Sequence, residues 1–463
     1  MLAARLADPL RVRWIVMRGL GVIYVSIFVS LWGTIQGLIG PRGLEPAAEL
    51  LTTLRAEMSL PVRLWVAPSL CWLSASNGAL TALVVVGLVA SLALVANLWP
   101  RLSLALCAIA FLSFAAVAQS FAYYQSDGMI MEASLLGWFY APRGLRPGLG
   151  AASPPSRAAL WLMRWEWFRI YFMSGVVKLM SGESQWRDLT AMVKYYENGP
   201  LPTWIGWYVQ ELLPRGFHIG VALFTLALEL VLPFAVLLPQ RWRVRAFVIF
   251  TVFQIGIILT GNYAFLNYLV LLLGFTIACD QPAAKTPAWR EQLGWSGLVA
   301  YVTVTALGFA GWWKAPQQLL SPFRIGESYG LFAVMTRARY ELEFQGTLDG
   351  KTWVPYPFRW KPQDPYKAPG IYAPYQPRFE WDLWFASLED SSDWPWVVTC
   401  EERLRAGEPT VLRLFARDPF AGKHPLAVRV VKWRYWFTTP AERRATGAWW
   451  RREWIGEYAP PVP

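Results

Sequence analysis

Histidine and cysteine are scarce in this chain of 463 residues. With only two histidines, His218 and His424, a histidine-built metal centre is not expected, and we predict no metal site. The four cysteines lie far apart, and two of them fall inside apolar runs: Cys71, Cys107, Cys279 and Cys400. This spacing excludes a disulfide framework and a CxxC redox or zinc site.

Charge is also scarce, at 16% of the residues, where soluble globular proteins carry about a quarter. Hydrophobic residues make up 55% of the chain and 28 residues are tryptophan, whose indole ring collects at membrane–water boundaries. The composition predicts a multi-pass membrane protein in contact with membrane lipids. The net charge of +12 accompanies no recognisable nucleic-acid module, so we expect no nucleic-acid partner.

The common catalytic signatures are missing from the sequence. It has no phosphate-binding loop, no HExxH and no G-x-S-x-G elbow, and two histidines make a histidine-based triad unpersuasive. We therefore predict no cofactor, and no sequence motif identifies a reaction.

Long apolar runs dominate the first two-thirds of the chain. About 20 apolar residues can cross a bilayer. The candidates are residues 19–39, 79–99, 102–122, 160–180, 217–238, 246–259, 263–279 and 296–313, with a shorter run at 128–140. This predicts an α-helical polytopic bundle of eight or nine transmembrane helices over residues 1–313. The first run is too long for a signal peptide and lacks a cleavage site, so we expect an uncleaved helix.

The basic residues predict the orientation of the bundle. Arginines precede the first run, so the N-terminus is expected to be cytoplasmic. Nine crossings also place the other basic loops inside: Arg101, then Arg143, Arg146 and Arg157, then Arg241, Arg243 and Arg245, then Lys285 and Arg290. Residues 314–463 then face away from the cytoplasm.

Residues 314–463 are polar and contain no apolar run long enough to span. Period-two alternation around an "LDGK" turn in 338–360, and again in 410–420 and 426–439, predicts strands. We expect a mostly β soluble domain, for example a small sandwich.

Two carboxylates and a lysine are the strongest candidates for chemistry within the apolar segments. Asp127 and Glu132, five residues apart, would be offset by about 140° on a helix. They could carry acid–base chemistry or ion binding, or pair with neighbouring helices, which is the commoner fate of buried polar groups. Lys178 could snorkel or pair with Glu132 or Glu229; desolvation could instead make it a base.

Two loops expected on the outer side carry the remaining candidates. In the first loop, residues 186–202, we expect an interfacial tryptophan, a turn at 198–199 and an extended Pro-Leu-Pro stretch. In the second loop, residues 259–268, we expect a tight turn between two helices. Each loop could be a client- or ligand-binding surface or a rigid connector. The residues are Trp186, Arg187, Asp188, Tyr196, Glu197, Asn262 and Asn267.

Ordered motifs along nearly the whole chain resemble the lipase maturation factor family. They include "SDGMIMEASLL", "LMRWEWFRIYFMSGVVKL" with "WRDLTAM" and "YYENGPLP", "LTGNYAFLNYL" and "ESYGLFAVMTRARYELEFQGTLDGKTW". The resemblance implies a chaperone-like membrane factor, in the endoplasmic reticulum of animals, for the folding and assembly of secreted lipases or other exported client proteins. The compact chain, without an obvious C-terminal retention signal, suggests a bacterial member in the plasma (inner) membrane, with a periplasmic rather than lumenal domain.

A more remote similarity links "YFMSGVVKL" and "FQIGIILTGNYAFLNY" to the membrane domain of vitamin K-dependent gamma-glutamyl carboxylase. That similarity places Lys178 at the position of the carboxylase base, while Gln254 stands where the carboxylase has a histidine. It implies an alternative function: an enzyme acting on a lipid, quinone or peptide, with Glu132 or Asp127 tuning Lys178. A transporter or lipid-binding bundle is a third hypothesis, since intramembrane charges often mark pathways.

Overall fold

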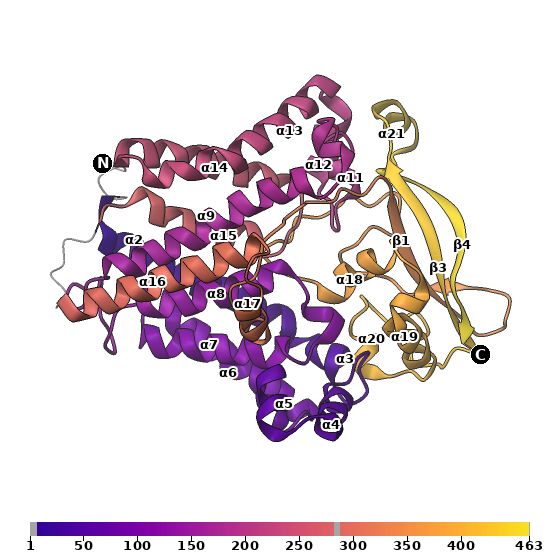
Figure 1. The fold of residues 1–463 in the computed structure, drawn as a ribbon. Helices are drawn as coiled ribbons and strands as arrows, with labels where there is room; N and C mark the ends of the chain where they lie inside the picture. The colour runs from indigo at the N-terminus through magenta and orange to yellow at the C-terminus, as the bar shows by residue number, and fades with distance from the viewer. Residues whose placement is uncertain (1–6, 282–287, 463) are drawn as a thin grey trace.

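The computed structural model describes residues 7–281 and 288–462 and shows a helical bundle joined to a C-terminal domain (Figure 1). The long helices run back and forth between the two ends of the bundle. They are α2 (Pro9–Trp32), α6 (Asn77–Val95), α7 (Pro100–Ala115), α8 (Gln125–Tyr140), α9 (Arg157–Met180), α13 (Arg215–Leu230), α14 (Gln240–Thr260), α15 (Leu266–Ala278) and α16 (Ala288–Phe309).

Short helices gather mainly at the end of the bundle that faces the C-terminal domain. They are α3 (Ile35–Ile39), α4 (Ala47–Glu57), α5 (Leu60–Val66), α10 (Ser184–Arg187), α11 (Tyr195–Asn198), α12 (Trp204–Leu212) and α17 (Ala315–Leu320), with the 3-10 turns η1 (Leu70–Trp72), η2 (Gln119–Ala122), η3 (Leu232–Leu237) and η4 (Ser321–Phe323).

The first helix is shifted from its predicted position at residues 19–39. It begins at Pro9, where the Asp8 side chain caps it, and ends at Trp32. Arg13 is buried inside it because its guanidinium donates to the carbonyl groups of Ser153 and Gly150, at 2.6 and 2.9 Å. The prediction was wrong here because it placed every arginine outside the helix.

Four of the described helices are long and apolar enough to cross a membrane: α2, α6, α13 continued through η3, and α14. Helices α7 and α15 are apolar but have only 16 and 13 residues, fewer than the roughly 20 that a crossing needs. The expectation of eight or nine full spans therefore exceeds the described helices that meet both conditions. Helix α9 is long enough, but it carries several charged residues.

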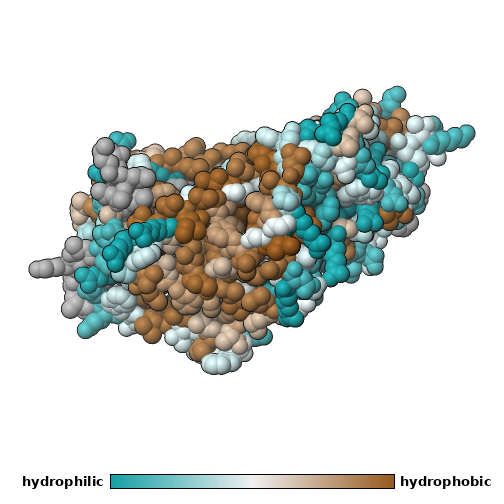
Figure 2. All heavy atoms as spheres, turned by 90° about the horizontal axis from the view of Figure 1, so that it is seen from above, coloured by the Kyte–Doolittle hydropathy of each residue, from teal (hydrophilic) through white to brown (hydrophobic). Residues whose placement is uncertain are grey.

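An apolar band covers the helical part of the molecule, with hydrophilic residues at both ends (Figure 2). Exposed apolar side chains from α13 and α14 contribute to the surface, among them Phe224, Val248 and Val252. In water such a surface would aggregate, whereas in lipid it is solvated. The band therefore confirms a helical transmembrane domain with several apolar helices.

The C-terminal domain contains an antiparallel sheet in the order β2-β1-β3-β4, four-stranded within the described residues. The strands are β1 (Arg339–Thr347), β2 (Val354–Pro355), β3 (Ala427–Phe437) and β4 (Trp450–Val462). The helical elements are α18 (Arg378–Ala386), η5 (Ser391–Asp393), α19 (Pro395–Arg405), α20 (Pro409–Leu412) and α21 (Pro440–Thr446), and α18 and α19 pack on the sheet. The domain is mixed, and the described residues form no second sheet that would make a sandwich.

The predicted strand at 410–420 was wrong. Glu408 caps α20 by accepting from the Thr410 amide, and Pro409 occupies its first turn. Val411, Leu414 and Phe415 are buried, a spacing of three and four residues that suits a helical turn better than a strand. The turn at 348–351 was correct: Asp349 accepts from the amides of Lys351 and Thr352, and Gly350 has φ +72°.

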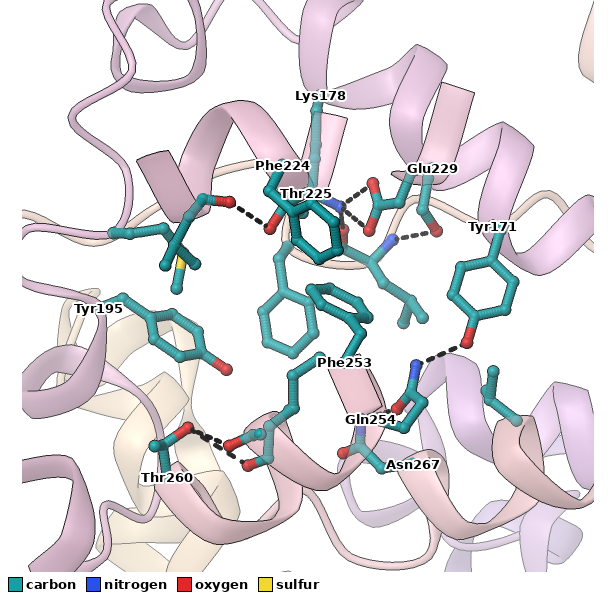
Figure 3. Close-up of a pocket in the computed structure, with 18 of the residues that line it drawn as sticks. Tyr171, Lys178, Tyr195, Phe224, Thr225, Glu229, Phe253, Gln254, Thr260 and Asn267 are labelled. Atoms are coloured by element: carbon teal, nitrogen blue, oxygen red, sulfur yellow. Dashed lines mark hydrogen bonds and ion pairs between the residues drawn. The ribbon is translucent and has the colours of Figure 1, made fainter. Parts of the chain in front are cut away.

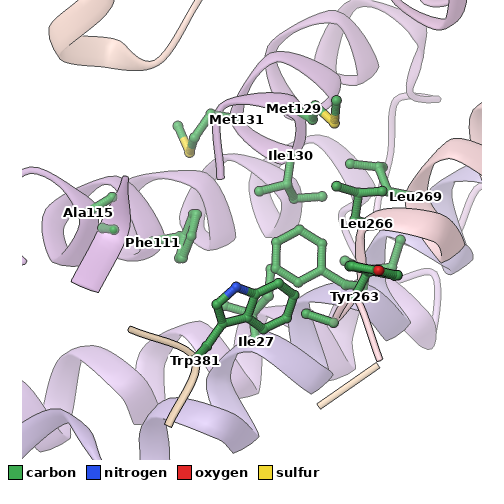
Figure 4. Close-up of a cluster of buried hydrophobic side chains, with 14 of the residues drawn as sticks. Ile27, Phe111, Ala115, Met129, Ile130, Met131, Tyr263, Leu266, Leu269 and Trp381 are labelled. Atoms are coloured by element: carbon green, nitrogen blue, oxygen red, sulfur yellow. The ribbon is translucent and has the colours of Figure 1, made fainter. Parts of the chain in front are cut away.

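The hydrophobic core runs without interruption from the bundle into the C-terminal domain. Figure 4 shows Ile27 of α2, Phe111 of α7 and Tyr263 beside Trp381 of α18. The Tyr263 and Trp381 ring centres are 6.3 Å apart. The two domains are thus packed against each other rather than tethered by a free linker.

Candidate functional site

A cavity of about 300 Å³ lies among α9, α13, α14 and the start of α15, and its lining includes the exposed side chains of Phe224 and Val252 (Figure 3). Its walls are mostly apolar. The polar groups that line it include Lys178 and Glu229 at one end and Gln254 and Asn267 at another. This cavity, cavity 1 below, has the character of a site for an apolar ligand with a few fixed polar contacts.

Lys178 is paired inside the protein. Its ammonium group lies 2.7 Å from Glu229 Oε2 and donates to the Leu331 carbonyl at 2.6 Å, and its side chain is 1% exposed. The Trp186 ring centre lies 5.1 Å away, within cation–π range. Of the two partners considered, Glu229 is the one that pairs with Lys178, and Glu132 is bound elsewhere. A buried pair of this kind is expensive to break, because removal of one partner leaves an uncompensated charge.

A chain of side-chain hydrogen bonds fixes the polar groups at the far side of cavity 1. Asn267 donates to Gln254 Oε1 at 2.7 Å, and Gln254 donates to the Tyr171 hydroxyl at 2.8 Å (Figure 3). Gln254 is thereby held in one orientation. Asn267 was predicted to lie in a tight turn between two helices, but it is the second residue of α15, and it lines cavity 1.

Asp127 and Glu132 are buried on α8 but take different partners. Both Asp127 oxygens accept from the Arg378 guanidinium at 2.8 Å, which joins α8 to α18. Glu132 accepts from Arg169 at 2.6 Å and from the Tyr329 hydroxyl. Neither carboxylate lines a described cavity, so Lys178, Glu132 and Asp127 do not share one site.

Residues 325–336, for which the sequence reasoning predicted no structural role, cross the end of the bundle in extended and turn conformations. We call this segment the strap. Its carbonyl groups accept hydrogen bonds from seven described side chains of the bundle and its adjoining loops and short helices: Arg169, Lys178, Ser181, Gln185, Trp186, Asn198 and Gln317. Phe332 has φ +56°, a left-handed conformation that is uncommon for a bulky residue. The strap has no periodic pattern, and only its aromatic and glycine content could have marked it.

The first loop behaves partly as predicted. Trp186 was expected to anchor at the interface but is 2% exposed, because its indole N–H donates to the Phe332 carbonyl at 2.9 Å. Arg187 and Asp188 are exposed, and Arg187 donates to the Leu179 carbonyl. Trp186 therefore lines cavity 1, whereas Arg187 and Asp188 do not.

Tyr196 and Glu197 face the protein interior. Tyr196 lines cavity 1, whereas Glu197 accepts from the Phe437 amide of β3 and from Gln210, both at 2.9 Å. The Glu197 carboxylate thus joins the membrane-side loop to the sheet.

Asn262 is a structural cross-link between two loops and the C-terminal domain. Its side-chain amide donates to the Gly370 carbonyl at 2.9 Å, and its oxygen accepts from the amides of Tyr372 and Ala373 at 2.9 and 3.1 Å. The predicted connection between α14 and α15 is confirmed. Within the described residues, no group of three or more potential metal ligands comes together.

Comparison with known proteins gives matches along both parts of the chain. Residues 11–285 match the lipase maturation factor transmembrane domain, and residues 325–460 match the lipase maturation factor C-terminal domain. The chain is 30% identical to lipase maturation factor 1 of Bos taurus, covering 97% of this chain and 88% of that protein. It is 29% identical to lipase maturation factor 2 of Gallus gallus, covering 98% and 82%. No solved structure matches the chain.

Proposed function

The chain belongs to the lipase maturation factor family, and we propose that it is a membrane-bound factor that helps exported lipases or other exported clients fold and assemble. The observation that carries the proposal is that both family domains match in one chain. The geometry supports it, because the C-terminal domain is held firmly against one end of the apolar bundle.

The basic loops and the C-terminal domain support one orientation in the membrane. Arg101 donates to the Ala141 carbonyl, and both Arg164 and Arg243 donate to the Cys279 carbonyl, so these arginines gather at one end of the bundle. Figure 1 places the N-terminal helix start at that end and the C-terminal domain at the other. We assign the basic end to the cytoplasm and the domain to the lumen or periplasm. The division at residue 313/314 remains a prediction.

Accessibility labelling tests this orientation directly. Lys367→Cys on the C-terminal domain and Arg146→Cys in a basic loop introduce thiols at exposed positions. The native cysteines are buried, so background labelling is low. A membrane-impermeant maleimide added to intact cells, or to the lumenal side of vesicles, should label only the first variant. The opposite pattern would contradict the orientation.

The proposed maturation activity is tested with a client whose active oligomeric state is known. A secreted homodimeric lipase is expressed in cells without their own maturation factor, with and without this chain. We expect the chain to raise the secreted activity per mass of lipase and the dimer fraction in sedimentation. Equal activity and dimer fraction, with the chain present and folded in the membrane, would contradict the proposal.

The second candidate is an enzyme or lipid-binding bundle that uses cavity 1, since the cavity reaches Lys178. The double variant Lys178→Met with Glu229→Gln removes both charges and leaves none uncompensated. If the pair is structural, the variant keeps lipase maturation at an unchanged folded amount. If Lys178 is a base, the variant loses lipase maturation although the amount of folded protein is unchanged. Native mass spectrometry of the purified chain should also show a retained lipid or quinone under this candidate.

A further inference from the structure

A second cavity, of about 530 Å³, lies where the bundle meets the C-terminal domain. It is lined by the start of α8, the turn at residues 198–200, the strap and α18. Tyr123 and Val334 on its rim are 74% and 67% exposed, while Asp382 on its wall is 2% exposed. The cavity, cavity 2 below, therefore runs from the surface to a buried carboxyl group.

Aromatic rings make up a continuous wall of cavity 2. Nine of its lining residues are aromatic. The Tyr124 ring centre lies 5.6 Å from that of Trp381 and 6.3 Å from that of Phe385, and Trp384 continues the row at 4.9 Å from Phe385. On the other side, the Trp381 and Tyr263 ring centres are 6.3 Å apart, and Figure 4 shows both side chains. The faces of aromatic rings attract cations through their quadrupole.

Cavity 2 also holds acceptors without donors. Asp382 Oδ2 and Asn198 Oδ1 are buried, line the cavity and lack a hydrogen-bond partner. The nearest cation on α18, Arg378, already bonds to both oxygens of Asp127. No lysine or arginine is among the described residues that line the cavity. Buried polar groups are normally satisfied, so the orphaned oxygens mark a place where a ligand completes the structure.

The lining discriminates among ligand classes. An anion would find no cationic side chain, and a neutral apolar ligand would leave Asp382 Oδ2 without a hydrogen-bond partner. A hard metal ion requires six or more oxygens, and one carboxylate does not supply them. A primary ammonium presents three N–H donors, which exceed the two orphaned acceptors. A quaternary ammonium has no donors to satisfy and binds through aromatic faces and one negative charge.

We propose that cavity 2 binds a quaternary ammonium group of the choline type, through its aromatic wall and the Asp382 carboxylate. The group could belong to a free small molecule or to a lipid headgroup, because the cavity lies at the domain end of the apolar band. The volume exceeds that of the ammonium group alone and leaves room for its substituents.

Binding is coupled to a proton. Burial raises the pKa of Asp382 well above its usual range, opposed by the Tyr124 hydroxyl and Arg378, while Glu45 and Asp127 raise it further. The raised pKa favours the protonated carboxyl in the empty cavity, whereas a bound cation favours the carboxylate. Complex formation therefore releases a proton, so affinity for the cation increases with pH.

The test uses the full chain purified in a choline-free maltoside detergent. Choline binding is measured by calorimetry and tryptophan fluorescence against 3,3-dimethyl-1-butanol, its neutral isostere. We expect choline to bind at least ten-fold more tightly, and Asp382→Asn to lower its affinity at least ten-fold. Asp390→Asn removes an exposed carboxylate from the same domain and should change nothing. Trp394→Leu, at a half-buried lining position, serves as a second variant if Asp382→Asn does not fold.

The outcomes separate the sources of the group. If choline binds, the ammonium group belongs to a free small molecule. If choline does not bind but phosphatidylcholine is retained over phosphatidylglycerol in native mass spectrometry, the group belongs to a lipid headgroup. Both results support the proposal. Equal affinity for the neutral isostere, tighter binding of butylamine than of choline, or no retention and no binding of either choline source would overturn it.

Discussion

The ion pair between Asp127 and Arg378 should hold the C-terminal domain on the bundle. Both oxygens of Asp127 accept from the guanidinium at 2.8 Å, and neither side chain is more than 1% exposed. Loss of one partner from such a pair costs about 3–5 kcal/mol, because the other charge stays buried. Asp127→Asn keeps the shape of the side chain and removes its charge. We expect it to raise the equilibrium constant for opening of the junction by roughly two to three and a half powers of ten.

Hydrogen exchange of the full chain in detergent measures this opening at the amides of α18. The matched control is Arg451→Met, which removes a partner of the Arg451–Glu442 pair. That pair has the same 2.8 Å contact but lies on the surface of the domain, with side chains 51% and 36% exposed, so its loss should cost little stability. The double variant Asp127→Leu with Arg378→Met should recover much of the stability, since it buries no charge. If Asp127→Asn accelerated exchange in α18 no more than Arg451→Met does, the assigned role of the pair would be wrong.

Three further predictions follow from buried polar and thiol groups. Asn262→Ala leaves the amides of Tyr372 and Ala373 without an acceptor, so it should cost about 3 kcal/mol, measured as faster hydrogen exchange at those amides; unchanged exchange there would refute the cross-link. Burial raises the pKa of Glu401 to about 8, so the folded state holds a proton that the unfolded state loses near pH 4.3. Stability should therefore fall as pH rises from about 5 to 8, by at most about 1.4 kcal/mol per pH unit, and the melting temperature of Glu401→Gln should depend less on pH. All four cysteines are buried and free, so maleimide should label them only after denaturation, and fast labelling of the native chain would contradict their burial.

The sequence predicted those elements whose residues repeat with one period. Apolar runs located the bundle helices, and alternation located β1 and β3, whereas β4 was not predicted. The errors have local physical causes. The segment after Pro409 alternates on paper, but its buried residues are spaced for a helical turn. Arg13 is inside a helix because loop carbonyl groups solvate it.

The candidate site was only partly predictable, because its contacts join segments that are far apart in the sequence. Lys178 could be identified as a buried cation, and Glu229 was one of two partners considered. The choice between Glu229 and Glu132 depends on how α9 packs against α8 and α13, which no local pattern contains. Trp186 was predicted to be an interfacial anchor, but in the structure its indole N–H donates to the Phe332 carbonyl of the strap. Long-range hydrogen bonds to backbone carbonyl groups have no signature in sequence.

The strap makes cavities 1 and 2 parts of one system. Leu331 and Phe332 line both cavities, as do Tyr195 and Leu266, so the two spaces share a wall. The Leu331 carbonyl accepts from Lys178, and the Phe332 carbonyl accepts from Trp186, which also lines cavity 1. A ligand that moves Phe332 in cavity 2 must therefore change the shape of cavity 1 and the hydrogen bonds around Lys178. Because such coupling is reciprocal, a ligand in cavity 1 must alter affinity at cavity 2 by the same factor. The buried Lys178 is thus connected through the strap to the wall of cavity 2 at the C-terminal domain.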